Sequence, residues 1–210
     1  MKSGMWNLEY ILLAALWILW CTLHSFLIAQ GVTSHLKRSF GDRFRYYRVF
    51  FNLVSVGTLI PVLVYSVSLR TGPFFNWSGI WRVVQLLLTL SALGLFYAGG
   101  RHYDLAQFLG IRQVSEHESA MGLTDTGMLD TSGILGVIRH PWYAGGILII
   151  WARPLDMAAV VTNTVLTMYL LVGTILEERK LVQQFGDEYR DYQERVPMFF
   201  PGGRRQKEEV

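Results

Sequence analysis

Two polar blocks in the C-terminal half of the sequence combine residue types that could do chemistry together. The first block is Arg139-His140-Pro141-Trp142-Tyr143, and the second is Glu177-Glu178. The residues between them are mostly apolar, with one turn at Arg153-Pro154. A chain that folds back at this turn brings a guanidinium, an imidazole and two carboxylates to one end of a helical hairpin. Such a group could bind a charged ligand, and every other candidate residue must be able to reach it.

The two glutamates have two explanations, and the sequence leaves both open. As solvated acids beside Arg179 and Lys180, they would simply mark the end of an apolar helix. However, acids at the carboxyl end of a buried helix oppose the helix dipole unless a cation compensates for them. Arg139 or a cationic ligand could be that cation. Because adjacent helical positions point about 100° apart, we expect at most one of the two glutamates to face a cavity squarely.

The residues at the start of the hairpin are open to a structural or a functional interpretation. His140 could satisfy backbone groups ahead of the helix that Pro141 begins, but ionisable residues at membrane depth are functional candidates by default. Tyr143 could direct its hydroxyl into the same cavity or lie at the interface as an aromatic residue. Gly145-Gly146 allows a close approach, which is more commonly that of a neighbouring helix.

Three further residues are candidate proton acceptors: His24, His102 and Asp104. His24 stands with Ser25 in an apolar run, where hydrogen bonding between helices explains it about as well as catalysis does. Asp104 follows His102 in a polar segment, and acids in such segments are usually just solvated. All three therefore remain candidates for a catalytic base.

The composition of the 210-residue chain is typical of an integral membrane protein. Hydrophobic residues make up 51% and charged residues 17%, with a mean hydropathy of +0.29, whereas about a quarter of a soluble domain is charged. Long apolar runs predict an all-α helical bundle of about five transmembrane helices in a single domain, residues 1–210. The predicted spans are residues 6–29, 49–69, 83–100, 141–152 and 157–176, followed by a cytoplasmic helical tail, 177–210.

The fourth predicted span is too short to cross a bilayer at full thickness. Its dozen residues cover about 18 Å, against a hydrocarbon thickness of about 30 Å. We therefore expect its starting motif to lie below the membrane surface and to line a polar cavity. The fifth span completes a helical hairpin with it. The helix should continue to about Phe185, break at Gly186 and be followed by a short helix that begins at Asp187.

The distribution of positive charge predicts the orientation of the chain. Fifteen of the 19 lysines and arginines fall in the segments after spans one and three and in the tail. The positive-inside rule places these segments in the cytoplasm and the N-terminus outside. His24, His102, Asp104, His140 and the two glutamates then share the cytoplasmic side, so the site should open towards soluble cofactors.

Several function classes are disfavoured by what the sequence lacks. It has no strand–GxGxxG–helix unit, P-loop, GxSxG or HExxH motif. The single Cys21 supports no disulfide framework, and without zinc-type Cys/His spacing we expect no metal. The bases of the tail alternate with acids, so anionic lipid of the bilayer is a simpler partner than nucleic acid.

Four motifs in the last third of the chain resemble a known family. Arg139-His140-Pro141-Trp142-Tyr143, Glu177-Glu178-Arg179-Lys180-Leu181, Phe185-Gly186-Asp187-Glu188-Tyr189 and Val196-Pro197 with Pro201 are similar to the membrane methyltransferases related to isoprenylcysteine carboxyl methyltransferase. In that family the corresponding residues form the S-adenosylmethionine pocket. The resemblance thus implies cofactor contacts from Arg139, His140, Tyr143, Gly145, Glu177 and Glu178.

The first two-thirds of the chain resembles one subgroup of these enzymes. Leu23-His24-Ser25, Tyr47-Arg48, Tyr103-Asp104-Leu105 and Phe108-Leu109-Gly110 with Gln113 are similar to the subgroup that contains methanethiol S-methyltransferase and the NnrU-like proteins. That subgroup often has more spans than the five predicted here. A thiol acceptor is what this resemblance implies, and a thiol attacks as its thiolate. A base is then needed, for which His24, His102 and Asp104 are the candidates.

The expected function is therefore an S-adenosylmethionine-dependent integral membrane methyltransferase that acts on a small or lipophilic thiol, such as methanethiol. Because the methyl donor is already reactive, the protein would mainly align the acceptor and exclude water. A prenylcysteine carboxylate or phospholipid amine methyltransferase is the second hypothesis. The third is a non-catalytic membrane assembly or transport protein on the same scaffold.

Overall fold

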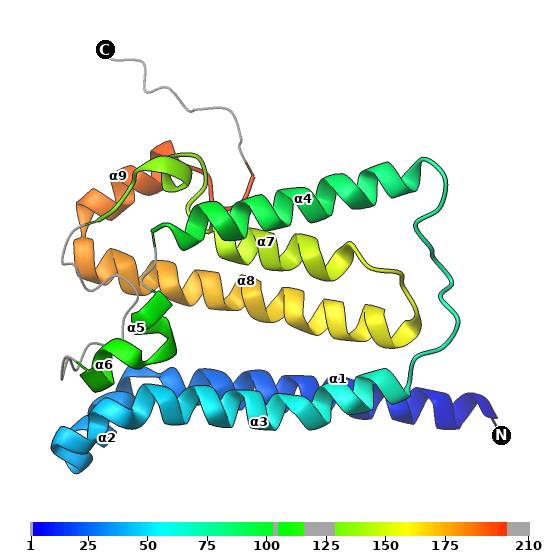
Figure 1. Cartoon of the computed structure of the whole chain (residues 1–210), viewed down its shortest axis with the longest axis horizontal. Helices are drawn as coiled ribbons and strands as arrows, with labels where there is room; N and C mark the ends of the chain where they lie inside the picture. The colour runs from blue at the N-terminus through cyan, green and yellow to red at the C-terminus, as the bar shows by residue number, and fades with distance from the viewer. Residues whose placement is uncertain (1, 103–104, 116–128, 201–210) are drawn as a thin grey trace. The chain divides into compact units, whose positions relative to one another are not determined.

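The computed structural model describes residues 2–102, 105–115 and 129–200, and their regular structure is helical (Figure 1). Within these ranges there is no β-strand, only an isolated bridge between Phe75 and Leu155. The prediction of an all-α fold is confirmed. The helices are α1 (Lys2–Ile28), α2 (Gln30–Phe40), the 3-10 helix η1 (Gly41–Tyr46), α3 (Tyr47–Ser68), α4 (Trp81–Gly100), α5 (Leu105–Leu109), α6 (Ile111–Ser115), the 3-10 helix η2 (Gly133–Gly136), α7 (Pro141–Trp151), α8 (Met157–Phe185) and α9 (Asp187–Arg195).

Four helical segments of the described chain are long and apolar enough to cross a membrane. They are Leu8–Ile28, Gln30–Ser68, Trp81–Gly100 and Met157–Phe185. The predicted integral membrane fold is confirmed by them. Helix α7 is apolar as well, but its 11 residues are too few to cross a bilayer alone. The fourth predicted span is thus a short helix, as expected from its length.

The basic segment after the first predicted span is helical. Helix α2 occupies Gln30–Phe40, and η1 continues directly from it. Lys37 and Arg38 lie in the last turn of α2, where positive charge complements the helix dipole. Gly41 ends the helix with φ +50, and its N–H bonds to the carbonyl of Lys37. The positive charges of this segment predicted the orientation of the chain, but the helix itself was not predicted.

The described chain divides into two compact units. The first comprises residues 2–75, 105–115 and 154–166 and therefore includes α1 to α3 and the first turns of α8. Its apolar core contains Leu13 and Trp17 of α1, Val62 of α3 and Ala158 of α8. His24 belongs to this unit.

The second unit comprises residues 76–102, 129–153 and 167–200. In it, α7 lies between α4 and the C-terminal part of α8 (Figure 1). A Cβ atom at Gly145 would lie 3.2 Å from the carbonyl oxygen of Ala92 in α4, and one at Gly146 would lie 3.3 Å from Leu170 in α8. The adjacent glycines therefore let α7 approach a different helix on each side. Glycine serves helix packing here.

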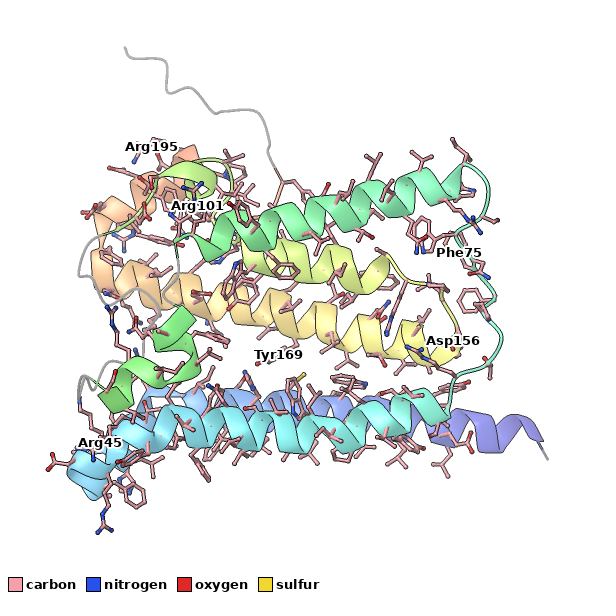
Figure 2. All side chains as sticks on the ribbon, viewed as in Figure 1. Arg45, Phe75, Arg101, Asp156, Tyr169 and Arg195 are labelled. Carbon is pink, nitrogen blue, oxygen red and sulfur yellow. The ribbon has the colours of Figure 1, made fainter. Side chains whose placement is uncertain are left out.

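The connection from α7 to α8 forms the predicted hairpin. Near the turn, the indole N–H of Trp151 donates to the hydroxyl of Thr167 at 2.9 Å. Asp156 precedes α8 (Figure 2), and its Oδ1 accepts a hydrogen bond of 2.7 Å from the N–H of Ala159. This carboxylate caps the helix N-terminus. At the other end, α8 stops at Phe185, Gly186 adopts φ +60, and α9 begins at Asp187, as predicted.

Candidate functional site

A buried ion pair joins the two polar blocks at the start of α7. The Nε of Arg139 lies 2.6 Å from Oε1 of Glu178. Their side chains are only 7% and 10% exposed. The compensating cation that the glutamates require is thus supplied to Glu178 by Arg139, one of the two alternatives left open by the sequence.

The carboxylate of Glu178 is surrounded by donors in addition to this arginine. His140 Nε2 lies 3.1 Å from Oε1, the hydroxyl of Tyr189 donates to the same oxygen at 3.3 Å, and Gln193 Nε2 donates to Oε2 at 2.7 Å. A buried carboxylate with this many donors is held in its ionised form. Glu178 therefore acts as the centre of a rigid polar network that links α7, α8 and α9.

The segment after α9 folds over the start of α7. Arg139 donates through Nη1 to the carbonyls of Gln193, at 3.0 Å, and Val196. The backbone N–H of Arg139 bonds to the carbonyl of Pro197 at 3.0 Å, and that of His140 to Met198 at 3.2 Å. These donors precede Pro141, which occupies the first turn of α7 and fixes where the helix starts. Their bonds leave few loose backbone groups at this buried helix start.

Two buried tyrosines of α9 complete the polar network. The hydroxyl of Tyr192 donates to the carbonyl of Leu135 at 2.5 Å. Burial raises the pKa of Tyr192 to about 12. Burial, followed by the negative charge of Glu178, raises the pKa of Tyr189 still further. Both phenols are therefore neutral donors at physiological pH.

Glu177 differs sharply from its neighbour. Its side chain is 35% exposed, yet its Oε2 atom is buried and has no hydrogen-bond partner among the described residues. The Nδ1 atom of His140 lies 3.8 Å from this oxygen. Arg139 compensates the negative charge of Glu178 but not that of Glu177. The expectation that the two acids differ in orientation agrees with this geometry.

The remaining predicted cofactor residues flank the same point on α7. The rings of His140 and Tyr143 meet edge to face, with centroids 5.6 Å apart, and the His140 side chain is only 4% exposed. Gly145 lies one turn from this pair and faces α4, so its close contact with Ala92 accounts for the glycine. His140, Tyr143 and Glu177 are thus grouped, and Gly145 lies against a helix.

The three candidate bases have different surroundings. His24, in the first unit, has Nδ1 3.2 Å from the hydroxyl of Ser55 and stacks on Trp20 with centroids 5.2 Å apart. This contact joins α1 to α3 and matches the structural alternative for His24. His102, in the second unit, has Nδ1 2.7 Å from Oδ2 of Asp130. Asp104 lies outside the described residues.

An apolar cavity of about 570 Å³ lies in the second unit beside this network. Residues of α4, η2, α7 and α8, most of them aliphatic, form most of its wall. Gly94, Ile134 and Thr167 are part of this wall. Phe199 and Phe200 complete it. The ring of Phe199 also packs on His140, at 6.3 Å between centroids. The sequence did not reveal this cavity, because its walls come from five separate stretches of ordinary apolar residues.

The described residues hold no group of three or more histidine, cysteine, aspartate or glutamate side chains that could bind a metal ion. The positively and negatively charged groups of the site are instead paired with each other, apart from Glu177. Together, the fold and this network define a helical integral membrane protein. Its charged site lies where the start of α7 meets the C-terminal turns of α8.

The chain belongs to the family described as NnrU protein, which matches residues 12–199. It is 33% identical over 143 residues to methanethiol S-methyltransferase 1 of Bradyrhizobium diazoefficiens, a match covering 61% of this chain and 49% of the relative. Over 144 residues it is 33% identical to methanethiol S-methyltransferase of Pseudomonas deceptionensis, covering 63% and 55%.

A more distant match is to protein-S-isoprenylcysteine O-methyltransferase of Schizosaccharomyces pombe. It is 31% identical over 135 residues, covering 61% of this chain and 54% of the relative. The resemblance found in the sequence motifs is confirmed by these matches. The chain spans about half the length of the curated relatives it matches. No solved structure matches it significantly.

Proposed function

We propose that this protein is an S-adenosylmethionine-dependent methyltransferase of the membrane that transfers a methyl group to a thiol. One observation supports this most directly: Glu177 keeps a buried carboxylate oxygen that has no hydrogen-bond partner among the described residues, 3.8 Å from Nδ1 of His140, whose ring packs on the cavity-lining Phe199. A cationic ligand would satisfy that oxygen. The methyltransferase names of the relatives favour the same reaction class.

The residues present fit such a cofactor. S-adenosylmethionine, when bound, supplies an activated methyl group on a positively charged sulfur. Glu177 attracts this positive charge and the amino group of the cofactor, since an opposite charge is favoured strongly at a partly buried site. The Arg139–Glu178 pair fixes the start of α7 and so fixes His140 and Tyr143 around the cofactor. Phe199 and Phe200 exclude water from the acceptor side.

The apolar cavity supports an acceptor thiol that has an apolar substituent. Thr167 is one of few polar residues in its wall, and its hydroxyl already accepts a bond from Trp151. Methanethiol would fill only a small part of about 570 Å³, so larger alkyl thiols should bind more tightly through buried apolar area. A prenylcysteine carboxylate is the alternative acceptor, favoured only by the weaker match to the isoprenylcysteine enzymes.

Calorimetric titration of the detergent-purified protein with S-adenosylmethionine and S-adenosylhomocysteine tests the cofactor assignment. We expect both compounds to bind. Glu177→Gln should lower the affinity for S-adenosylmethionine by at least about tenfold, because a charge-assisted contact contributes roughly 1.5–3 kcal/mol. Asp191→Asn, at an exposed acid of α9 outside the four motifs, is the matched control and should leave the affinity unchanged. A folded protein that binds neither compound would remove every methyltransferase hypothesis and leave the non-catalytic one.

The acceptor assignment is tested by filling the cavity. A Cβ atom at Gly94 would meet nothing within 4 Å, and Gly94 lines the cavity. Gly57 in α3 is equally open but belongs to the first unit. We expect Gly94→Leu to lower kcat/KM for octanethiol by about 10–200-fold, the range for poor fit in an apolar pocket, and to spare methanethiol. Gly57→Leu should spare both. Methylation of a prenylcysteine carboxylate but of no thiol would contradict the thiol assignment.

A further inference from the structure

A histidine–aspartate pair lies outside the network of Glu178 in the second unit. His102 follows the end of α4 directly after Arg101, whose place is seen in Figure 2. The Nδ1 atom of His102 lies 2.7 Å from Oδ2 of Asp130. The two residues are 28 positions apart in the chain, so their contact is made by the fold and by no local turn.

Asp130 is itself held in place on its other oxygen. Oδ1 accepts bonds from the backbone N–H of Ser132, at 2.9 Å, and from its hydroxyl, at 2.7 Å. These bonds, with the one to His102, lower the pKa of Asp130. The carboxylate is therefore ionised and can only accept a hydrogen bond at its Oδ2 atom. It follows that Nδ1 of His102 bears the proton that is donated to Asp130.

With the proton on Nδ1, a neutral His102 presents the lone pair of Nε2 on the opposite side of its ring. Gly133 lies close to that side of the ring. A Cβ atom at this position would lie 2.8 Å from Nε2, and the backbone there has φ +54, which favours glycine. A side chain at this position would collide with the ring, so glycine is needed for the close approach of the backbone to Nε2.

His102 and Gly133 line a small pocket of about 330 Å³, together with Tyr97, Arg101 and Ile134. Arg101 provides positive charge that stabilises an anion such as a thiolate. Ile134 lines the large apolar cavity as well, so the two spaces adjoin at this residue. The large cavity reaches Phe199, which packs on His140. The base thus adjoins the proposed acceptor site.

We propose that the His102 pocket is the place where the acceptor thiol loses its proton, with His102 as the base and Asp130 as the residue that positions it. This rests on the proposed thiol methyltransferase function. His102 Nε2 takes the proton of the S–H group, and the resulting thiolate sulfur forms a bond to the methyl carbon of the sulfonium cofactor. The bond from that carbon to the cofactor sulfur breaks and leaves a neutral thioether. His102 then releases its proton to water.

A purely structural pair that ties the end of α4 to the following segment is the competing explanation. His102→Asn distinguishes the two, because the asparagine amide can still donate to Asp130 but offers no basic nitrogen on the pocket side. We expect this variant to retain its affinity for S-adenosylhomocysteine by calorimetry and to methylate alkyl thiols about 10²–10⁴-fold more slowly.

The dependence of this defect on the thiol gives a readout that a structural role would not move. Above the pKa of an alkyl thiol, or with a strongly acidic thiol such as thiophenol, the acceptor is already ionised in water. The rate of His102→Asn should then approach that of the wild-type protein. Among the described residues, the charged and titratable groups around His102 are Tyr97, Arg101 and Asp130, and none of them is removed in this variant.

Asp130 is tested by nitrogen NMR of the histidine rings and by kinetics. In the wild-type protein we expect the His102 signal, assigned by its loss in His102→Asn, to show protonated Nδ1 and unprotonated Nε2. Asp130→Asn should abolish this tautomer preference and lower kcat by at least about tenfold, as a wrongly oriented imidazole does in other His–Asp pairs. Asp130→Glu should restore part of the rate, and Asp191→Asn, at an exposed acid of α9, should change neither property.

Three outcomes would overturn the proposal in distinguishable ways. If His102→Asn methylates all thiols at the wild-type rate, His102 is not the base. If its defect is equal for alkyl thiols and thiophenol at every pH, its role is structural. If the wild-type protein binds the cofactor but methylates no thiol, the proposed acceptor is wrong, and the proposal fails with it.

Discussion

Glu177 and Glu178 are neighbours in the chain with opposite electrostatic surroundings. The helical rotation of about 100° per residue turns Glu178 towards Arg139, Tyr189 and Gln193 and leaves Glu177 at the rim, beside His140. Glu178 is paired with Arg139 within the fold. In the proposed function, Glu177 is the acid that binds the ligand.

This separation predicts opposite effects of two equivalent substitutions. Glu178→Gln leaves the buried guanidinium of Arg139 without its charge partner, and breaking a buried pair costs about 3–5 kcal/mol. We expect a large fall in thermal stability, measured by circular dichroism in detergent. Glu177→Gln should change stability by less than about 1 kcal/mol, since its side chain is more exposed.

The double variant Arg139→Met with Glu178→Leu is the control for this interpretation. Replacing both partners of a buried pair by apolar residues is often close to neutral, so much of the lost stability should return. If Glu178→Gln unfolds at the wild-type temperature, the ion pair is not a structural element and Glu178 must be considered a cofactor residue.

The sequence predicted some of the residues of the site and could not predict others. Arg139 was a candidate partner for the glutamates because a buried helix end requires a cation there. Asp130 could not be assigned to His102, since nothing in the sequence indicates that a carboxylate 28 residues away returns to it. Tyr189 belonged to a motif of the sequence, but its bond to Glu178 and that of Gln193 were not predicted, because the fold of the tail over α7 is determined by tertiary contacts.

At the scale of the elements, apolar length was a reliable guide to the helices and a poor guide to their ends. Helix α8 continues nine residues past the predicted membrane boundary, to Phe185, because its last turns pack their apolar faces on Tyr189 and Val196. The sequence signal at Gly186 was correct, since a positive φ is needed where the chain turns into α9. The end of α8 at Phe185 was therefore predicted from the sequence, although its last apolar stretch was predicted to end at Leu176.

The docking of α9 should depend on pH through its buried tyrosines. Burial raises the pKa of Tyr192 to about 12, above the value of about 10 for an unfolded chain. Because the folded protein holds this proton more tightly, stability is fully present below pH 10 and falls as the pH rises from 10 to 12. We expect each pH unit in this range to cost up to about 1.4 kcal/mol for Tyr192.

Tyr192→Phe tests this expectation. The variant lacks the hydrogen bond to Leu135 and should be less stable at neutral pH by about 1 kcal/mol. It should also lose less stability than the wild-type protein between pH 9 and 11, measured by thermal unfolding in detergent. Tyr46→Phe, at an exposed tyrosine of η1, is the matched control. Parallel pH curves for wild type and Tyr192→Phe would show that Tyr192 does not titrate in the unfolding reaction.

For the whole molecule, the decisive property is the side of the membrane on which the site opens. The relevant charges lie outside the spans predicted from the sequence: Lys37 and Arg38 in the last turn of α2, and Arg190 and Arg195 in α9. A bilayer with a negative cytoplasmic surface favours that side for both segments. Since S-adenosylmethionine is a soluble, charged molecule, the proposed function requires the Glu177 site on the same side.

Cysteine labelling of membrane vesicles with known sidedness gives the last prediction. The native Cys21 is buried and is the single cysteine of the chain, so it provides an unreactive background. We expect Lys37→Cys and Arg190→Cys to react with an impermeant maleimide from the cytoplasmic side, and Gly72→Cys, at an exposed position between α3 and α4, to react from the opposite side. Labelling of Arg190→Cys from outside would place the tail and its carboxylates away from the cofactor, and the proposed methyl transfer would then be untenable in this membrane.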